Sequence, residues 1–434
     1  MKLLVISGAF PPMASGEAAN TFHLCRRLAA AGVEVHLLTT RQPRIEQLDG
    51  VKLYPIMRHW SWREAGKLRR AIRNAAPEAI LLMHLSGIYR NHPMVTFMAT
   101  FAKRVLPGVR FVTRFENPMF AVDQQPSLTS RALRKTAVLW AGASRCSYGF
   151  GTLLRDSDAV IALCEYHLER LRVEDPTVER KGVLIPPPAN VTVVTDQDGV
   201  LRRRGRQALA APQGAFVVGY LGYLYPVKGV ETLLRAIASL VSQKLTVRLV
   251  ILGGSPDVAG IDGGTVSYYD QMQQLAVDLG LEGLTTWSGG FSAVNDDVAA
   301  SIHAADAFVL PFDNGIHLNN SSLATLASYG VPIVATKEHS DRALVDQENV
   351  LLCPPRDPAA IADAIRKLID HPKLAARLRA GARALARDYF DWDTALQRTL
   401  TSLTATPARE LSHLSKRERG LSPAPDASAG QPHQ

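Results

Sequence analysis

Short apolar runs alternate with amphipathic segments of helical periodicity along most of the chain, and this alternation restricts the fold more than any other feature. In the first half we expect strands at residues 2–7, 35–39, 51–56, 79–83 and 110–113, and one that ends at residue 163. In the second half we expect strands at residues 216–221, 248–252, 284–288, 307–310 and 332–336. Apolar strands that alternate with helices are typical of βαβ units in parallel sheets. The pattern predicts an α/β protein with two parallel sheets in series.

The length favours two domains, because one hydrophobic core rarely serves more than about 300 residues and the chain has 434. We expect a first Rossmann-like, doubly wound domain at residues 1–190, a hinge at 191–213 and a second such domain at 214–390. Two domains of this kind that face each other leave a cleft along both sets of strand ends. Residues 407–434 are rich in Pro, Ser, Ala and Gly, and we expect them to be disordered.

Charge and cysteine content limit the partners and the compartment. The net charge of +9 favours acidic partners, which include nucleotide phosphates, an anionic membrane and nucleic acid, and nucleic acid has only this charge in its favour. The four cysteines lack the short spacings of zinc sites, so the sequence indicates neither a metal site nor a disulfide framework. We expect a cytoplasmic location. The N-terminal apolar run predicts a strand, not a signal segment, and no run of about 18 apolar residues predicts a transmembrane helix.

A basic segment follows the third expected strand. It contains Trp60 and Trp62 and then a helix with the cations Lys67, Arg69, Arg70 and Arg73. Aromatic and basic residues on one helix face are typical of contact with anionic lipid, and a solvated helix face is the alternative. The sequence therefore predicts a possible peripheral contact with the membrane. The long connection at 118–155 is expected to form helices on the acceptor or membrane side.

Polar residues follow the expected strands at their carboxyl ends, where parallel sheets bind ligands. In the first half, His84 ends one strand, and Arg114 and Glu116 follow another. Gly16 lies in the first loop, ahead of a helix expected at residues 24–31, and its missing side chain lets a ligand approach the backbone. Each of these residues can also be an ordinary loop or turn residue. As candidates, they place part of a site in the first domain.

Two loops of the second half predict an anion site. One follows a buried strand, carries Lys228 and starts a helix. The other reaches a helix at Asn320, Ser321 and Ser322, where side chains can cap the helix and backbone N–H groups are free. Helix N-termini bind phosphate groups. We expect both strand ends to converge on a phosphate or diphosphate.

These elements occur in an order that resembles the family-4 glycosyltransferases of GT-B fold. The resemblance covers about residues 1–405 and rests on a PPxxxxGxxxN loop, AGVEVHLLTT, SDAVIALC, GYLGYLYPVKGVETLLRA, VRLVILGG, HAADAFVLPF, ASYGVPIVAT and FDWDTAL. It implies two facing Rossmann-like domains and a nucleotide-diphosphate sugar bound mainly by the second. It also implies transfer of a hexose with retention, without a cofactor or bound metal. The final helix, 391–405, is implied to pack back on the first domain.

Some motif positions match the family and others differ. The phosphate loop fits at Gly222, Leu224, Lys228 and Gly229. Tyr223 stands where the family usually has an arginine, and His317 and Thr325 stand where it has two glutamates. The resemblance implies that Lys228 and the amides of Ser321 and Ser322 contact the diphosphate. It also implies that His317 contacts a sugar hydroxyl and Thr325 a ribose hydroxyl.

The candidate residues fall into two groups. The catalytic candidates are Glu116, Arg114, His84 and His317, and the donor-binding candidates are Gly16, Tyr223, Lys228, Asn319, Asn320, Ser321, Ser322 and Thr325. The implied partners are a UDP- or GDP-linked sugar and a saccharide, lipid-linked saccharide or small-molecule acceptor. Two alternatives share the fold: a non-catalytic subunit that binds a nucleotide sugar, and a nucleotide-sugar epimerase.

Overall fold

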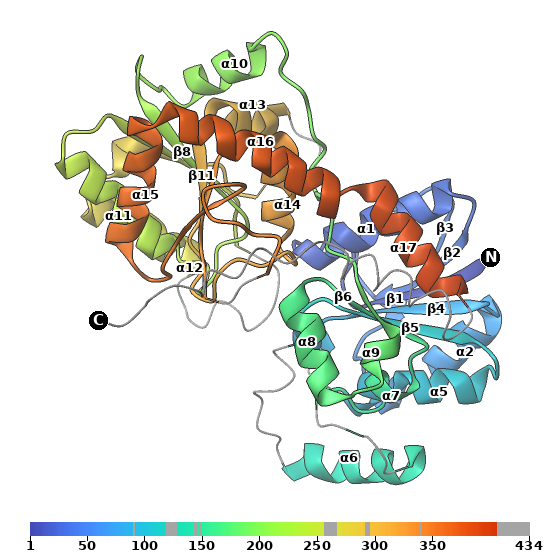
Figure 1. Cartoon of the computed structure of the whole chain (residues 1–434). Helices are drawn as coiled ribbons and strands as arrows, with labels where there is room; N and C mark the ends of the chain where they lie inside the picture. The colour runs from blue at the N-terminus through green and yellow to red at the C-terminus, as the bar shows by residue number, and fades with distance from the viewer. Residues whose placement is uncertain are drawn as a thin grey trace, which may run out of the picture.

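The computed structural model describes residues 1–89, 92–118, 128–142, 146, 149–255, 267–290, 296–338 and 341–405. The chain folds into two lobes, each built around a parallel sheet (Figure 1). Among the described residues, no helix combines the length and apolarity needed to span a membrane. The tail that we expected to be disordered, 407–434, lies outside the described residues.

The first sheet has seven strands in the order β3-β2-β1-β4-β5-β6-β7. They are β1 (Lys2–Ser7), β2 (Glu34–Thr40), β3 (Val51–Met57), β4 (Ala79–His84), β5 (Arg110–Phe115), β6 (Ala159–Ala162) and β7 (Gly182–Leu184). All neighbouring strands are parallel. The strand order reverses between β1 and β4, so the crossover connections leave the sheet in opposite directions there. This reversal opens the carboxyl edge of the first sheet to a ligand.

Helices cover both faces of the first sheet. They are α1 (Gly16–Ala30), α2 (Ala65–Ala75), α3 (Ser86–Tyr89), α4 (Pro93–Thr96), α5 (Met98–Val105), α6 (Leu128–Ala141), α7 (Leu153–Asp156), α8 (Glu165–Glu174) and α9 (Val178–Lys181), and the short 3-10 helix η1 (Trp62–Glu64) precedes α2. Alternate side chains of β1 pack into different hydrophobic cores, because Leu3 lies on one face of the sheet and Leu4 on the other. The helix expected at 24–31 begins earlier, at Gly16.

The second sheet has six parallel strands in the order β10-β9-β8-β11-β12-β13. They are β8 (Phe216–Leu221), β9 (Val247–Leu252), β10 (Thr285–Trp287), β11 (Ala307–Leu310), β12 (Ile333–Thr336) and β13 (Leu351–Cys353). Here the order reverses between β8 and β11. The two loops that we expected to share an anion therefore leave adjacent strands at the reversal.

The helices of the second half are α10 (Val200–Ala208), α11 (Val230–Ser242), α12 (Tyr268–Asp278), α13 (Asp296–Ala304), α14 (Ser321–Tyr329), α15 (Pro358–Asp370), α16 (Pro372–Tyr389) and α17 (Trp392–Thr404), with the 3-10 helix η3 (Glu282–Leu284) before β10. Part of the stretch that we expected to be a hinge, 191–213, forms α10. This helix packs closely on α13, because a β-carbon on Gly205 would lie 2.1 Å from the Ala300 carbonyl oxygen. The connection between the domains is thus the extended segment before α10.

The last helix lies on the first domain, although α16 packs on the second (Figure 1). Trp392 Nε1 donates a hydrogen bond to the Ala189 carbonyl oxygen at 3.1 Å. Further along α17, Arg398 Nη1 donates to the Leu184 carbonyl oxygen at 3.1 Å, and Arg110 Nε of β5 donates to the Ser402 carbonyl oxygen at 2.8 Å. The chain therefore passes between the domains twice.

Candidate active site between the domains

The first helix begins where the two domains meet. Ser15 Oγ accepts a hydrogen bond from the Ala18 amide at 3.1 Å and caps α1, so Gly16 and Glu17 form its first turn. A β-carbon on Gly16 would lie 4.0 Å from Ser321 Oγ of the second domain. The amino end of α1 therefore faces the amino end of α14.

The facing helix, α14, is capped by Asn320, whose side chain accepts a hydrogen bond from the Leu323 amide at 3.0 Å. Ser321 and Ser322 form its first turn and are half-buried. The loop after β8 also reaches this point, because a β-carbon on Gly222 would lie 3.0 Å from Ser322 Oγ. The first amides of a helix have no partner within the helix, and a helix start carries a partial positive charge. Two such ends that face each other form an anion-binding arrangement.

Lys228 supplies a full positive charge beside these helix ends. Its Nζ lies 4.0 Å from the centroid of the Phe312 ring and 5.1 Å from that of the Tyr225 ring, which restrict its position through cation–π contacts. Gly229 follows with φ of +66°, and a β-carbon there would lie 1.8 Å from the Pro311 carbonyl oxygen. Only glycine permits this turn. The turn brings the loop of Lys228 against the loop that follows β11.

Glu17 also belongs to the site, and our sequence analysis did not include it. Burial, followed by the charge of Glu116, raises the pKa of Glu17 to about 7, while Lys228 acts in the opposite direction. The charges of Glu116, which follows β5, and of Lys228, in the second domain, therefore both act on Glu17 of α1. The only signal in the sequence was an acidic residue in the turn directly after Gly16.

Arg114 and Glu116 form a buried pair at the end of β5, with Arg114 Nε 2.9 Å from Glu116 Oε1. Burial raises the pKa of Glu116, and Arg114 opposes that shift. The pair lacks the alignment of a hydrogen bond, and within the described ranges Arg114 Nη2 and Glu116 Oε1 have no hydrogen-bond partner. Buried polar atoms nearly always have partners. A ligand oxygen and a ligand hydroxyl would supply them.

His84 lies inside the core at the end of β4, and not on the surface of the cleft. Its side chain is 0% exposed and packs between Phe115, with ring centroids 5.1 Å apart, and Tyr89, with centroids 6.0 Å apart. Burial lowers the pKa of His84 to about 4, so the imidazole is neutral. The short helix α3 supplies Tyr89 and closes over the strand end.

Two further donor-binding candidates have roles within the fold. Thr325 is buried, and its hydroxyl donates to the Ser321 carbonyl oxygen at 2.9 Å, so it does not reach a ribose. The Tyr223 carbonyl oxygen accepts a hydrogen bond from Tyr220 Oη at 3.1 Å, which orders the loop after β8. Tyr223 thus lies at the predicted loop. The arginine that it replaces has no counterpart at this position.

His317 lies in the loop before α14 and contacts the first domain. Its Nδ1 lies 3.3 Å from Asp341 Oδ2, and its ring stacks on Tyr166 with centroids 5.3 Å apart. The Asn320 amide donates to the His317 carbonyl oxygen at 3.2 Å, and Asn319 lies within this turn, half-buried. His317 is therefore next to the start of α14, as expected, but its imidazole is directed to Asp341.

Solved structures share this architecture. HepE from Anabaena in complex with UDP and glucose superposes with a TM-score of 0.68 at 17% identity, over 94% of this chain and 100% of that one. WaaG, a glycosyltransferase involved in lipopolysaccharide biosynthesis, superposes with a TM-score of 0.65 at 14% identity, over 93% of this chain and 100% of that one. The fold and the site between its two domains define a protein of GT-B type.

Sequence comparisons identify the family. The model for the glycosyl transferase 4-like domain matches residues 15–188, and the model for glycosyl transferases group 1 matches residues 215–371. The chain belongs to the family-4 glycosyltransferases of GT-B fold and is a transferase. A D-inositol 3-phosphate glycosyltransferase from Nocardioides sp. is 25% identical over 420 residues, which cover 89% of this chain and 84% of that protein. One from Thermomonospora curvata is 26% identical over 407 residues, 88% of each chain.

Proposed function

We propose that this protein transfers a hexose from a UDP- or GDP-linked sugar to a saccharide, a lipid-linked saccharide or a small-molecule acceptor, with retention of configuration. The observation that carries the proposal is the approach of Gly16 to Ser321, since a β-carbon on Gly16 would lie 4.0 Å from Ser321 Oγ. The amino ends of α1 and α14 thereby face one space beside Lys228. The complex of HepE with UDP and glucose supports a uridine nucleotide, and relatives that act on D-inositol 3-phosphate support a small-molecule acceptor.

In this proposal the protein stabilises the departing diphosphate without a bound metal or cofactor. The amides of Ser321 and Ser322 and the ammonium group of Lys228 would contact its oxygens. Preorganised donors of this kind lower the barrier because they need no reorientation as negative charge develops. Gly16 would allow the diphosphate to approach the start of α1 closely.

The proposed transfer takes place on one face of the sugar. The acceptor hydroxyl oxygen bonds to the anomeric carbon on the side from which the diphosphate leaves. The bond from that carbon to the phosphate oxygen breaks, its electron pair passes to the diphosphate, and the hydroxyl proton moves to a diphosphate oxygen. Arg114 Nη2 would donate to a sugar or acceptor oxygen, since it has no hydrogen-bond partner among the described residues. The Glu116 carboxylate, held by Arg114 Nε at 2.9 Å, would accept from a hydroxyl. Configuration is retained without a covalent intermediate.

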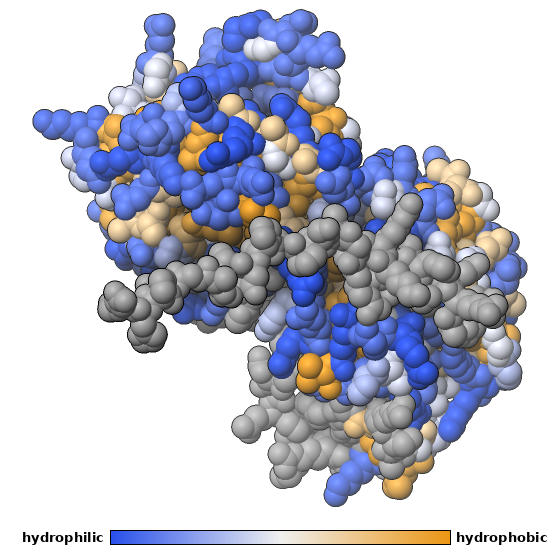
Figure 2. Space-filling view, in the orientation of Figure 1, coloured by the Kyte–Doolittle hydropathy of each residue, from blue (hydrophilic) through white to orange (hydrophobic). Residues whose placement is uncertain are grey.

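Membrane contact is a separate part of the proposal, and the structure changes the residues that could provide it. Trp60 is buried and its Nε1 donates to Thr40 Oγ1 at 2.9 Å, so it is not an interfacial aromatic. Lys67 Nζ lies 2.5 Å from Glu64 Oε1, so it is already paired. The exposed apolar side chains of the described part of the first domain include Leu139 and Trp140 of α6, which are 80% and 40% exposed. Figure 2 shows hydrophobic surface at the lower end of the molecule, where α6 lies in Figure 1.

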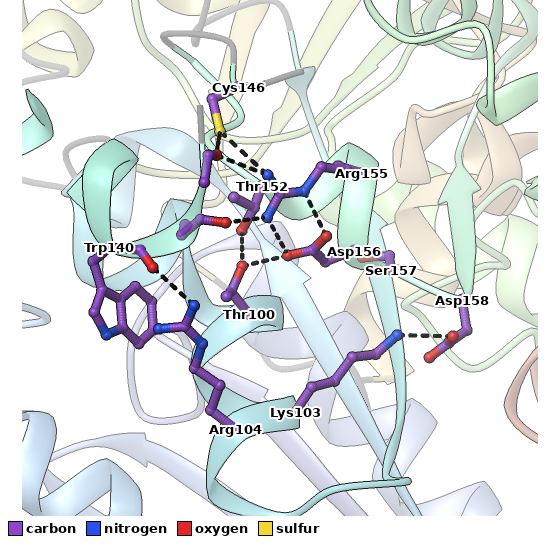
Figure 3. A network of polar contacts seen from close by, with 12 residues as sticks. Thr100, Lys103, Arg104, Trp140, Cys146, Thr152, Arg155, Asp156, Ser157 and Asp158 are labelled. Atoms are coloured by element: carbon purple, nitrogen blue, oxygen red, sulfur yellow. Dashed lines mark hydrogen bonds and ion pairs between the residues drawn. The ribbon is translucent and has the colours of Figure 1, made fainter. Parts of the chain in front are cut away.

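This end of α6 is attached firmly to the first domain. Arg104 Nη2 donates to the Trp140 carbonyl oxygen at 2.8 Å, with its guanidinium carbon 4.0 Å from the Trp140 ring centroid. Arg155 Nη2 donates to the Ala141 carbonyl oxygen at 3.0 Å, and Arg155 also pairs with Asp156 (Figure 3). The Trp140 ring lies edge-on to Trp62. We propose that this apolar end, with the exposed Arg69, Arg70 and Arg73 of α2, contacts anionic lipid.

Calorimetry with UDP, GDP, ADP and their hexose conjugates tests the donor site. We expect one nucleotide series to bind the wild type, and Lys228→Gln to weaken that binding at least about tenfold, because a charge-assisted phosphate contact is lost. Lys244→Gln is the matched control, since Lys244 is exposed in the loop between α11 and β9, at the other end of the strands. If no nucleotide binds, or if both variants bind equally, the proposed donor site is wrong. With the donor known, an acceptor screen that reads the anomeric configuration of the product by NMR tests retention.

A further inference from the structure

Three side chains that commonly bind metal ions meet where the domains contact each other, outside the proposed donor site. Cys164, His317 and Asp341 each offer one ligand atom, and these atoms all lie within 4.8 Å of one another. Cys164 follows β6 of the first domain and caps α8. His317 and Asp341 belong to the second domain, in the loops after β11 and β12. The cluster exists only while α8 touches those loops.

The distances suit a tetrahedral transition-metal ion. His317 Nδ1 and Asp341 Oδ2 are 3.3 Å apart. Two ligands at 2.0–2.1 Å from tetrahedral zinc are separated by about 3.3–3.4 Å, so this pair already has the required spacing. The Cys164 sulfur lies within 4.8 Å of the ligand atoms that the other two residues offer. A thiolate, an imidazole and a carboxylate also form a donor set that Zn²⁺ accepts, with a fourth position left for water.

Neighbouring groups orient these ligands, as outer-shell groups do in metal sites. Asp341 Oδ2 accepts a hydrogen bond from the Leu318 amide at 2.8 Å, and its Oδ1 accepts one from the Tyr166 amide at 3.4 Å. The Tyr166 ring stacks on the His317 ring at an interplanar angle of 12°. An ion pair between His317 and Asp341 alone would not require the Cys164 sulfur at the same point.

A further nitrogen lies beside the cluster. His167 follows Cys164 by three residues, and its amide donates to Cys164 Sγ at 3.5 Å. Its side chain is buried, and His167 Nδ1 has no hydrogen-bond partner among the described residues. Buried imidazole nitrogens usually have partners. A water molecule bound to an ion at the cluster would supply one.

We propose that Cys164, His317 and Asp341 bind a divalent transition-metal ion that bridges the two domains. The ion that we expect to bind is Zn²⁺. The Cys164 thiol releases its proton to solvent as the ion binds. Because the ligands come from both domains, the ion binds the closed arrangement and favours it over an open one. The ion takes no part in sugar transfer. It regulates the domain motion that admits donor and releases product.

Cobalt titration of the full-length protein, without a histidine tag and freed of metal by chelation, tests the site. We expect one Co²⁺ per chain, with absorption bands of tetrahedral cobalt and a sulfur-to-cobalt charge-transfer band that Zn²⁺ abolishes. Cys164→Ser should remove the charge-transfer band and weaken Co²⁺ binding at least about tenfold. Cys353→Ser is the control, because Cys353 is also buried but donates to the Ala335 carbonyl oxygen at 3.5 Å within the second domain. It should leave the band unchanged.

Two further variants keep the test independent of the folding of Cys164→Ser. His317→Gln and Asp341→Asn should each weaken Co²⁺ binding while circular dichroism and the melting temperature show a folded protein. Small-angle scattering should show a smaller radius of gyration when Zn²⁺ is added to the wild type, and no change in Cys164→Ser. A wild type without the charge-transfer band, a band that survives in Cys164→Ser, or an unchanged radius of gyration overturns the proposal. None of these readouts depends on sugar transfer.

Discussion

Gly16 of the first domain lies against Ser321 of the second, so that a β-carbon on Gly16 would be 4.0 Å from Ser321 Oγ. This distance accommodates a methyl group but not a ring. We expect Gly16→Ala to weaken donor affinity by about threefold, because the methyl group crowds the diphosphate, and Gly16→Phe to weaken it at least about tenfold by keeping the two helix starts apart. Calorimetry with the donor measures both, and equal melting temperatures show that the variants fold. Equal affinities in both variants would contradict the assigned geometry.

Donor affinity should depend on pH through Glu17, whose pKa is raised to about 7. The raised pKa means that Glu17 is neutral below pH 7 and becomes anionic above it, where it repels a diphosphate. We therefore expect the affinity for the donor sugar nucleotide to fall from pH 6 to pH 8, by at most about tenfold per unit. A sugar nucleotide is the suitable probe, because its diphosphate has no proton that titrates near pH 7.

Two variants isolate this effect. Glu17→Gln should largely flatten the pH dependence of donor affinity and raise that affinity at pH 8, with Glu116 and Lys228 as the remaining charges that act on the position. Glu169→Gln removes an exposed carboxylate of α8 and should leave the profile unchanged. A wild-type profile that is flat, or one that persists in Glu17→Gln, would show that Glu17 does not face the diphosphate.

Two glycines should respond to alanine in opposite directions. Gly229 has φ of +66°, and a β-carbon there would lie 1.8 Å from the Pro311 carbonyl oxygen. Gly229→Ala should lower the free energy of unfolding by at least about 2 kcal/mol and weaken donor binding, since it displaces the loop of Lys228. Gly66 lies in the first turn of α2 with no atom within 4 Å of its β-carbon position. Gly66→Ala should therefore raise the free energy of unfolding by up to about 0.5 kcal/mol, less than in the middle of a helix. Urea unfolding measures both changes.

The exposed end of α6 should contribute to binding of anionic vesicles. We expect the double variant Leu139→Ser, Trp140→Ser to reduce cosedimentation with vesicles that contain phosphatidylglycerol by about fivefold or more, because buried apolar area is lost. Val173→Ser is the control, since Val173 is 74% exposed on α8 of the same domain. Replacing Arg69, Arg70 and Arg73 by Gln should remove the salt-dependent part of the binding. Unchanged partitioning in the double variant would exclude α6 as the contact.

The sequence predicted the two parallel sheets because hydrophobic periodicity is local: the runs at 2–7 and 307–310 show buried strands without knowledge of their neighbours. The rule that strand ends carry ligand-facing residues selected both Glu116 and His84, and of these two His84 is fully enclosed. The rule gives a position along the strand and not what covers it, and α3 covers His84 with Tyr89. Trp60 was misassigned for the same reason, since its partner Thr40 ends a different strand.

Contacts between the domains were the least predictable part of the site. Burial and Glu116 of the same domain raise the pKa of Glu17, and Lys228 is the charge of the second domain that acts on it, in the opposite direction. Cys164, His317 and Asp341 come from three separate connections, so no spacing within one segment could have shown that they meet. Such relations arise only when both domains are folded and in contact.

The return of α17 to the first domain restricts how the two domains move. The chain crosses between them before α10 and again between α16 and α17, and hydrogen bonds from Trp392 and Arg398 fix the second crossing close to the end of the first domain's chain. The two crossings together restrict the relative motion of the domains. Sliding or twisting would strain one of them, whereas rotation about the line through both strains neither. We therefore expect the domains to open and close mainly by rotation about this line, so that a weak ligand that bridges them changes how often they open.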